Sequence, residues 1–191
     1  MNLQQRVANY HLVTKFPESL WVGGDNRING VWIMGNNYKV TSTYYGGYPH
    51  GYLKRVDALF PDRNKVLHLF SGKVDTATFP GDTVDINSDN APTYIDDAHT
   101  LLNVPLEEYD FVLADPPYSV EDCDHYKTTM IKRNVVMRAL QRLPTGAKIV
   151  WLDQVLPMFR KDKFKIIGVI GMVKSTNHRF RVVTIFEKIL A

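Results

Sequence analysis

The chain has 191 residues, of which 45% are hydrophobic and 23% are charged, and its formal net charge is +3. These values predict one soluble globular domain, or one domain with a small N-terminal addition, and exclude a low-complexity chain. No apolar run approaches the roughly 18 residues of a membrane span, and the N-terminus lacks a signal-peptide pattern. The single cysteine, Cys123, cannot form an internal disulfide, so we expect a cytoplasmic protein without membrane contact.

The first third of the chain shows few regular patterns. Residues 1 to about 30 have no clean apolar periodicity, and the short apolar run 31–34 predicts half of a hairpin. Residues 44–52 are dense in tyrosine and glycine, which is typical of a loop that approaches a ligand closely, or of a turn-rich loop packed on the core. Apolar residues at helical spacing then predict a helix over residues 52–60, which Pro61 ends.

Seven short apolar segments follow, interleaved with turns and with one long amphipathic pattern that predicts a helix over residues 126–143. Strands that alternate with helices indicate an α/β fold with a mostly parallel sheet. The last two segments are joined by a turn and predict an antiparallel C-terminal hairpin. The predicted strands are residues 65–70, 82–86, 94–98, 111–114, 147–152, 164–172 and 181–189.

The most informative stretch is the predicted strand over residues 111–114 and the Asp115-Pro116-Pro117-Tyr118 sequence that ends it. The two prolines lack ladder N–H groups and force an extended turn. Asp115 and the Pro116 carbonyl together could accept both hydrogens of an exocyclic amine, and the Tyr118 ring offers a stacking surface for a flat base. The alternative is a structural turn capped by a half-exposed tyrosine.

From about Tyr44 to the C-terminus, the order of these pieces resembles class I S-adenosylmethionine-dependent methyltransferases, most of all phage and bacterial DNA adenine-N6 methyltransferases. The Asp115–Tyr118 sequence matches their catalytic motif, so the implied catalytic residues are Asp115, Pro116 and Tyr118. The resemblance implies a Rossmann-like, seven-stranded, mostly parallel sheet with an antiparallel hairpin in residues 44–191. Residues 1–43 would form an N-terminal extension that could contact substrate.

The resemblance also assigns a site for S-adenosylmethionine, with no metal. Asp85 occupies the place of the carboxylate that binds the two ribose hydroxyls, and Asp97 that of the carboxylate that meets the adenine amino group. The loop that closes over the methionine end and the turn after the first strand complete the implied cofactor contacts. Their residues are Tyr44, Tyr45, Gly46, Leu69, Phe70, Ser71 and Gly72.

The chain departs from the family pattern after the first strand. Family members carry a glycine-rich loop and a helix there, whereas only about eleven residues separate the first two predicted strands. That length is close to the minimum for a crossover between parallel strands, and Pro80 and Gly81 oppose a helix. Lys73 also stands where a glycine is expected. We therefore expect the first crossover helix to be missing or very short.

The implied activity is methyl transfer to adenine N6 in DNA, with the target base flipped out of the duplex. The mildly basic charge permits a nucleic-acid partner without requiring one. Guanine-N2 methylation of ribosomal RNA is one alternative, and a non-catalytic binding or regulatory subunit with this fold is another. No segment is long enough for a separate target-recognition domain. Recognition of the target sequence would therefore come from the N-terminal 45 residues, from the loops at 120–126 and 174–181, from a second copy in a homodimer or from a protein partner.

Overall fold

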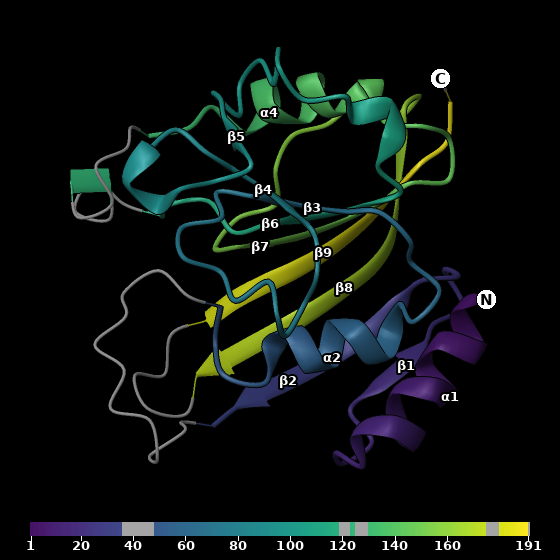
Figure 1. Ribbon diagram of the computed structural model, residues 1–191. Coiled ribbons are helices and arrows are strands. Elements are labelled where there is room, and N and C mark those ends of the chain that lie inside the picture. The colour runs from purple at the N-terminus through teal and green to yellow at the C-terminus, as the bar shows by residue number, and fades with distance from the viewer. Residues whose placement is uncertain (36–47, 119–122, 125–129, 175–179, 191) are drawn as a thin grey trace.

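The computed structural model describes residues 1–35, 48–118, 123–124, 130–174 and 180–190. These residues form one mixed sheet with the strand order β1-β2-β8-β9-β7-β6-β3-β4-β5 and with helices on both faces (Figure 1). The five central parallel strands are β3 (Val66–Leu69), β4 (Asp82–Asp85), β5 (Tyr94–Ile95), β6 (Phe111–Ala114) and β7 (Lys148–Asp153).

The last two strands form the predicted antiparallel hairpin. They are β8 (Phe164–Lys174) and β9 (Phe180–Lys188), and β9 also pairs antiparallel with β7. Strands β3 to β9 therefore confirm the predicted α/β class and the seven-stranded, mostly parallel sheet. The central strands β3 and β6 are buried at every position, which explains their continuous apolar sequences.

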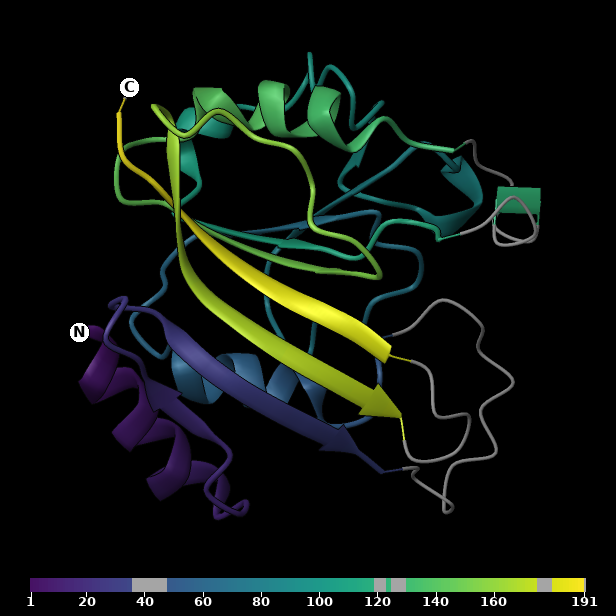
Figure 2. The same ribbon diagram turned by 180° about the vertical axis from the view of Figure 1, so that it is seen from behind.

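The sheet carries two strands more than the seven expected, and both come from the N-terminal region. β1 (Leu20–Val22) pairs antiparallel with β2 (Ile28–Met34), and β2 pairs in parallel with β8 (Figure 2). The apolar run 31–34 is thus one half of a hairpin, as predicted, but the hairpin extends the main sheet. The division of the chain at residue 43 stays a prediction.

A helix precedes these strands in the region where the apolar periodicity predicted none. Helix α1 (Leu3–Thr14) begins with a capping box, in which the Asn2 side chain accepts from the Gln5 N–H and the Gln5 side chain accepts from the Asn2 N–H. This Asn-x-x-Gln spacing is the sequence signal that would have located the helix. The apolar residues of α1 do not lie on a clean stripe, which is why periodicity missed it.

Helices cover the two faces of the sheet unequally. Helices α1 and α2 (Tyr52–Leu59) lie together on one face, and α4 (Arg133–Ala139) lies on the other (Figure 1). Each side has its own apolar core. α4 begins at Arg133, seven residues later than position 126 where the helix was expected to start, and ends in a 3₁₀ turn; residues 125–129 lie outside the described residues. The 3₁₀ segments are η1 (Ser88–Asn90), η2 (Leu106–Glu108) and η3 (Leu140–Arg142).

The crossover between β3 and β4 confirms the predicted loss of its helix. Residues 70–81 pass from one strand to the next through turns, and all of them are described. Gly81 explains why the connection can lie so close to the sheet, because a Cβ there would come within 2.8 Å of the Val66 carbonyl oxygen. The carboxyl edge of the sheet is therefore bordered by a short turn at this point.

Candidate active site

The strand order reverses between β3 and β6. Beyond β3 lie β4 and β5, and beyond β6 lies β7, so the chain segments that follow β3 and β6 lead toward opposite sides of the sheet. Leu69 pairs with Ala114 at the end of these two strands, which places Phe70 and Asp115 side by side at the carboxyl edge. Ligands of open α/β sheets bind in the crevice at such a reversal. The topology thus selects this edge as the candidate site.

Asp115 and Tyr118, two of the predicted catalytic residues, are in contact at this edge. The Tyr118 hydroxyl donates a hydrogen bond to Oδ1 of Asp115. Burial and the neighbouring Asp115 carboxylate raise the pKa of Tyr118 far above its ordinary value, so the hydroxyl keeps its proton. Pro116 and Pro117 are buried behind the half-buried Asp115. The turn therefore presents one carboxylate and one aromatic ring from a fixed backbone.

An arginine that the sequence analysis did not single out lies over the Tyr118 ring. The guanidinium carbon of Arg181 is 4.5 Å from the centre of that ring. Arg181 and the exposed Phe180 begin β9, and antiparallel pairing brings this end of β9 to the carboxyl edge of β7. Only the strand register places them here, because 63 positions of sequence separate Arg181 from Tyr118.

A buried ion pair lies on the other side of the motif, at the end of β7. The fully buried Asp153 accepts hydrogen bonds from Nε and Nη2 of Arg133, at 2.6 and 3.1 Å. It also accepts from the Trp151 indole at 2.9 Å and from the Gln154 backbone at 2.7 Å. The pair raises the pKa of Arg133 and fixes the start of α4 beside Tyr118. The sequence analysis missed both charged residues.

The predicted cofactor turn lies between the ends of β3 and β4. Phe70 and Gly72 both have left-handed backbone angles, with φ of 56° and 51°. The Gly72 N–H donates to Oδ2 of Asp85 at 2.8 Å, and the Ser71 N–H donates to the Val84 carbonyl at 3.1 Å. Leu69 is buried in the strand below. The structure therefore brings Asp85 together with residues 70–72, and their role in binding a cofactor stays a prediction.

Asp85 makes two further hydrogen bonds. Its Oδ1 accepts from the Asn87 N–H at 2.8 Å, and its Oδ2 accepts from the Asn90 side-chain amide at 3.1 Å. A carboxylate has about four acceptor positions, so these contacts occupy most of them. The Asn90 amide comes from a half-exposed turn.

Asp97 lies farther along the same edge, after β5, and is tied to a histidine. Its Oδ1 accepts from the His99 backbone at 2.9 Å and contacts His99 Nδ1 at 2.7 Å. His99 Nε2 accepts from the Lys132 N–H at 2.9 Å, which assigns the proton of the neutral ring to Nδ1. Although partial burial opposes it, the hydrogen bonds from His99 lower the pKa of Asp97.

The predicted loop over the methionine end, Tyr44, Tyr45 and Gly46, lies outside the described residues. The next tyrosine, Tyr48, is described and stacks on Tyr52 with ring centres 5.2 Å apart. Burial and the charge of Asp115 raise the pKa of both Tyr48 and Tyr52. The two phenols thus lie within electrostatic reach of Asp115.

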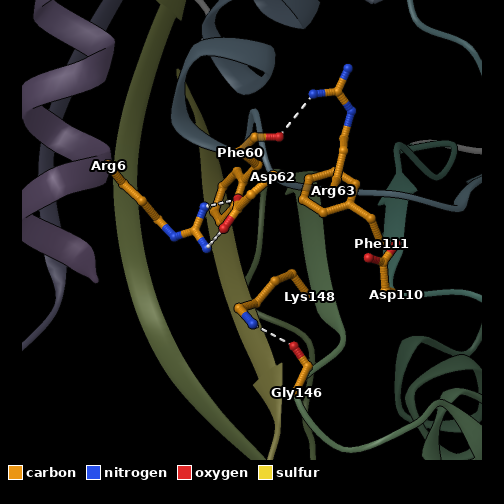
Figure 3. A pocket seen from close by; sticks show the side chains of 8 residues that line it. All are labelled: Arg6, Phe60, Asp62, Arg63, Asp110, Phe111, Gly146 and Lys148. Carbon is orange, nitrogen blue, oxygen red and sulfur yellow. Dashed lines mark hydrogen bonds and ion pairs between the residues drawn. The ribbon is translucent and has the colours of Figure 1, made fainter. Parts of the chain in front are cut away.

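A pocket at the opposite edge of the sheet has different properties. It is lined by the first residues of β6 and β7, Phe111 and Lys148, and by Arg6, Asp62 and their neighbours (Figure 3). Arg6 forms two hydrogen bonds with Asp62, at 2.6 and 2.9 Å, and Lys148 pairs with Glu187 at 3.2 Å. These charges are therefore already paired within the protein, and the strand-order reversal meets the other end of these strands.

The described residues form neither a metal site nor a membrane-spanning helix. Within the described ranges, no three His, Cys, Asp or Glu side chains are arranged to hold a metal ion. The helices of that same part of the chain are all too short or too polar to cross a membrane.

No family model and no curated protein matches this sequence. Among solved structures, a candidate S-adenosylmethionine-dependent methyltransferase from Streptococcus mutans aligns with 90% of this chain at a TM-score of 0.50 and 15% identity. The chain has the fold of these methyltransferases. The alignment spans 56% of the Streptococcus mutans protein, so that protein has a substantial part without counterpart here.

Two other solved structures are less similar in shape. A candidate hemolysin from Streptococcus thermophilus aligns with 72% of this chain and 64% of its own length, at a TM-score of 0.49 and 12% identity. A candidate methylase from Haemophilus influenzae aligns with 72% of this chain and 88% of its own, at a TM-score of 0.45 and 9% identity. At such identities the likeness concerns the fold, and the chemistry must be argued from the site.

Proposed function

We propose that this protein is an S-adenosylmethionine-dependent methyltransferase of the cytoplasm of a bacterium or phage-infected cell, acting on an exocyclic amine of a nucleic-acid base. One observation carries the proposal: the Asp115–Tyr118 motif ends β6 at the strand-order reversal, beside the turn that binds Asp85. Adenine N6 in DNA is the acceptor that the motif supports best.

The residues around the turn fit the proposed cofactor. The Ser71 hydroxyl is buried without a hydrogen-bond partner in the described part of the chain, and Gly72 leaves the backbone open to close approach. Asp85 would accept from the ribose hydroxyls after exchange of its Asn90 contact, and Asp97 would accept from the adenine amino group. When bound, S-adenosylmethionine supplies a methyl group on an electrophilic sulfonium.

The catalytic motif would act on the acceptor by positioning it. An exocyclic amine is a poor nucleophile because its lone pair is delocalised into the ring. Hydrogen bonds from its two hydrogens to Asp115 and the Pro116 carbonyl favour a pyramidal nitrogen with a directed lone pair. The amine would replace the Tyr118 hydroxyl on Asp115, and the Tyr118 ring would then stack on the flipped base.

Titration with S-adenosylmethionine and labelled-methyl assays test this function. Asp85→Ala should lose cofactor binding, whereas Asp115→Ala should lose transfer and keep most cofactor affinity. Equal loss of both properties in Asp115→Ala would contradict its assigned role. Parallel assays on DNA and RNA separate adenine-N6 methylation from the alternative, guanine-N2 methylation of ribosomal RNA.

The shortened connection between β3 and β4 supports a second candidate function, that of a non-catalytic subunit that kept the fold and lost the cofactor site. A folded wild-type protein without cofactor binding would support that candidate. If transfer is found, deletion of residues 1–35 asks whether the N-terminal extension contacts the substrate. Because β2 pairs with β8, alanine variants of its exposed residues Val31 and Ile33 are the safer probes.

A further inference from the structure

Several buried polar atoms near Asp115 have no hydrogen-bond partner among the described residues. They are the hydroxyls of Tyr48 and Tyr52 and Nε of Arg181. A buried polar group without a partner is costly, so native proteins rarely keep one unless a water, an ion or a ligand completes it. Three such atoms from α2, the segment before it and β9 converge on one edge of the sheet.

The Tyr48 ring is stacked on the Tyr52 ring, with centres 5.2 Å apart, and lies 6.5 Å from the His68 ring of β3, and the electrostatic coupling of the groups agrees with a shared environment. The charge of Asp115 acts on Tyr48 and Tyr52, and the charge of Arg181 acts on Tyr52 and Tyr118. Since burial raises the pKa of both buried tyrosines, their hydroxyls stay protonated at neutral pH and can donate. The environment thus offers two neutral donors and one cation, next to the Asp115 carboxylate.

Arg181 differs from the other arginine at the site. Arg133 is neutralised by the buried carboxylate of Asp153, whereas Arg181 forms no ion pair with a described carboxylate. Its guanidinium carbon lies over the face of the Tyr118 ring, 4.5 Å from the ring centre. A guanidinium has five N–H donors, and Nε of Arg181 has no hydrogen-bond partner among the described residues, so at least this N–H is available to an oxyanion.

We infer that Arg181, together with the hydroxyls of Tyr48 and Tyr52, forms an oxyanion subsite beside Asp115. This inference rests on the proposed function for the source of the oxyanion. A phosphate next to the flipped base of the nucleic acid has the required chemistry, and so does the carboxylate of S-adenosylmethionine. Arg181 is then a binding residue, and its contact with the Tyr118 ring couples oxyanion binding to the position of that ring.

The test compares Arg181→Gln with Arg138→Gln, which removes an equal charge from an exposed position of α4. Each variant is titrated with S-adenosylmethionine and, over a range of salt concentrations, with a DNA oligonucleotide. A phosphate subsite predicts about tenfold weaker DNA binding in Arg181→Gln, a salt slope smaller by about one, and unchanged cofactor affinity. A carboxylate subsite predicts about tenfold weaker cofactor binding instead. Equal behaviour of the two variants would overturn the inference.

Tyr52→Phe provides a readout that a purely structural role would not give. Loss of a buried hydroxyl without a partner should raise the thermal midpoint of the free protein, while weakening binding of the same oxyanion severalfold. A lower midpoint with unchanged binding would overturn the role of this hydroxyl. If Arg181→Gln does not fold, Arg181→Lys is used in its place. We then expect a smaller loss of binding affinity, because lysine retains the charge.

Failure of the proposed function can be recognised separately. A wild-type protein that binds neither S-adenosylmethionine nor DNA contradicts the proposed function. The thermal midpoint measured in inorganic phosphate then shows whether the oxyanion subsite exists. The wild-type protein and Arg138→Gln should both be stabilised by phosphate, and Arg181→Gln should not. An equal shift in all three proteins would show that the structure holds no such subsite.

Discussion

Replacing Asp153 by alanine is expected to destabilise the protein by about 3–5 kcal/mol, because the buried partner of a buried ion pair is removed. Asp153 is fully buried and accepts four hydrogen bonds, two of them from Arg133. The change leaves the Arg133 guanidinium without its counter-ion, and it leaves the Trp151 indole N–H buried without an acceptor. The lower end of the range applies if Arg133, whose side chain is 20% exposed, turns toward water.

Urea denaturation of the purified variant measures this change as a shift of the midpoint. Asp162→Ala is the matched control, since Asp162 pairs with Arg160 by the same chemistry but both side chains are more than half exposed. We expect no resolvable change in that variant. A loss below about 1 kcal/mol in Asp153→Ala, or equal losses in the two variants, would refute the argument from burial.

Three further changes test other parts of the structure. Asp62→Asn should lower the free energy of unfolding by about 1 kcal/mol at neutral pH, a value discounted for the 40% exposure of the Asp62 side chain. Arg6 lowers the pKa of Asp62 from 3.8 to about 2. In a series of denaturation experiments, the difference in stability between wild type and variant should therefore fade as the pH falls from about 4 to 2. Gly30→Ala should destabilise the protein by about 3 kcal/mol or more, because φ is 155° and a Cβ would lie 2.0 Å from a backbone oxygen. Gly24→Ala is the control: a Cβ there would meet nothing within 4 Å, so the thermal midpoint should stay nearly unchanged. Tyr118→Phe should keep the stacking surface and bind the acceptor at least as tightly as wild type, while Tyr118→Ala should weaken acceptor binding by about 1–3 kcal/mol in the same titration.

Much of the central sheet was predictable because its signals are local. The continuous apolar runs of β3 and β6 announce strands that are buried on both faces, and the two prolines after Asp115 mark where β6 must stop. The connection between β3 and β4 has too few residues for a full crossover helix, so its length alone excluded one. Asp85 and Asp115 were located by their places at strand ends, and parallel strands bring such ends to one edge.

Other features depended on contacts that no local pattern contains. β1 has only three residues, and β2 finds its partner in β8, more than 130 residues away along the chain. α4 starts at Arg133, where the Asp153 carboxylate holds the chain, rather than where the apolar periodicity begins. Periodicity gives the face of an element and not the position of a long-range ion pair, so the start of this helix was predicted wrongly.

The sequence by itself determined the class of fold, the order of the strands along the chain and the chemistry offered by Asp115, Pro116 and Tyr118. The tertiary structure decided what surrounds that chemistry: the arginine stacked on Tyr118, the ion pair of Asp153 and the two buried phenols of Tyr48 and Tyr52. The physical reason is the range of the interactions. Strand and turn preferences act over a few residues, whereas strand register and the pairing of buried charges join segments that only the folded chain brings together.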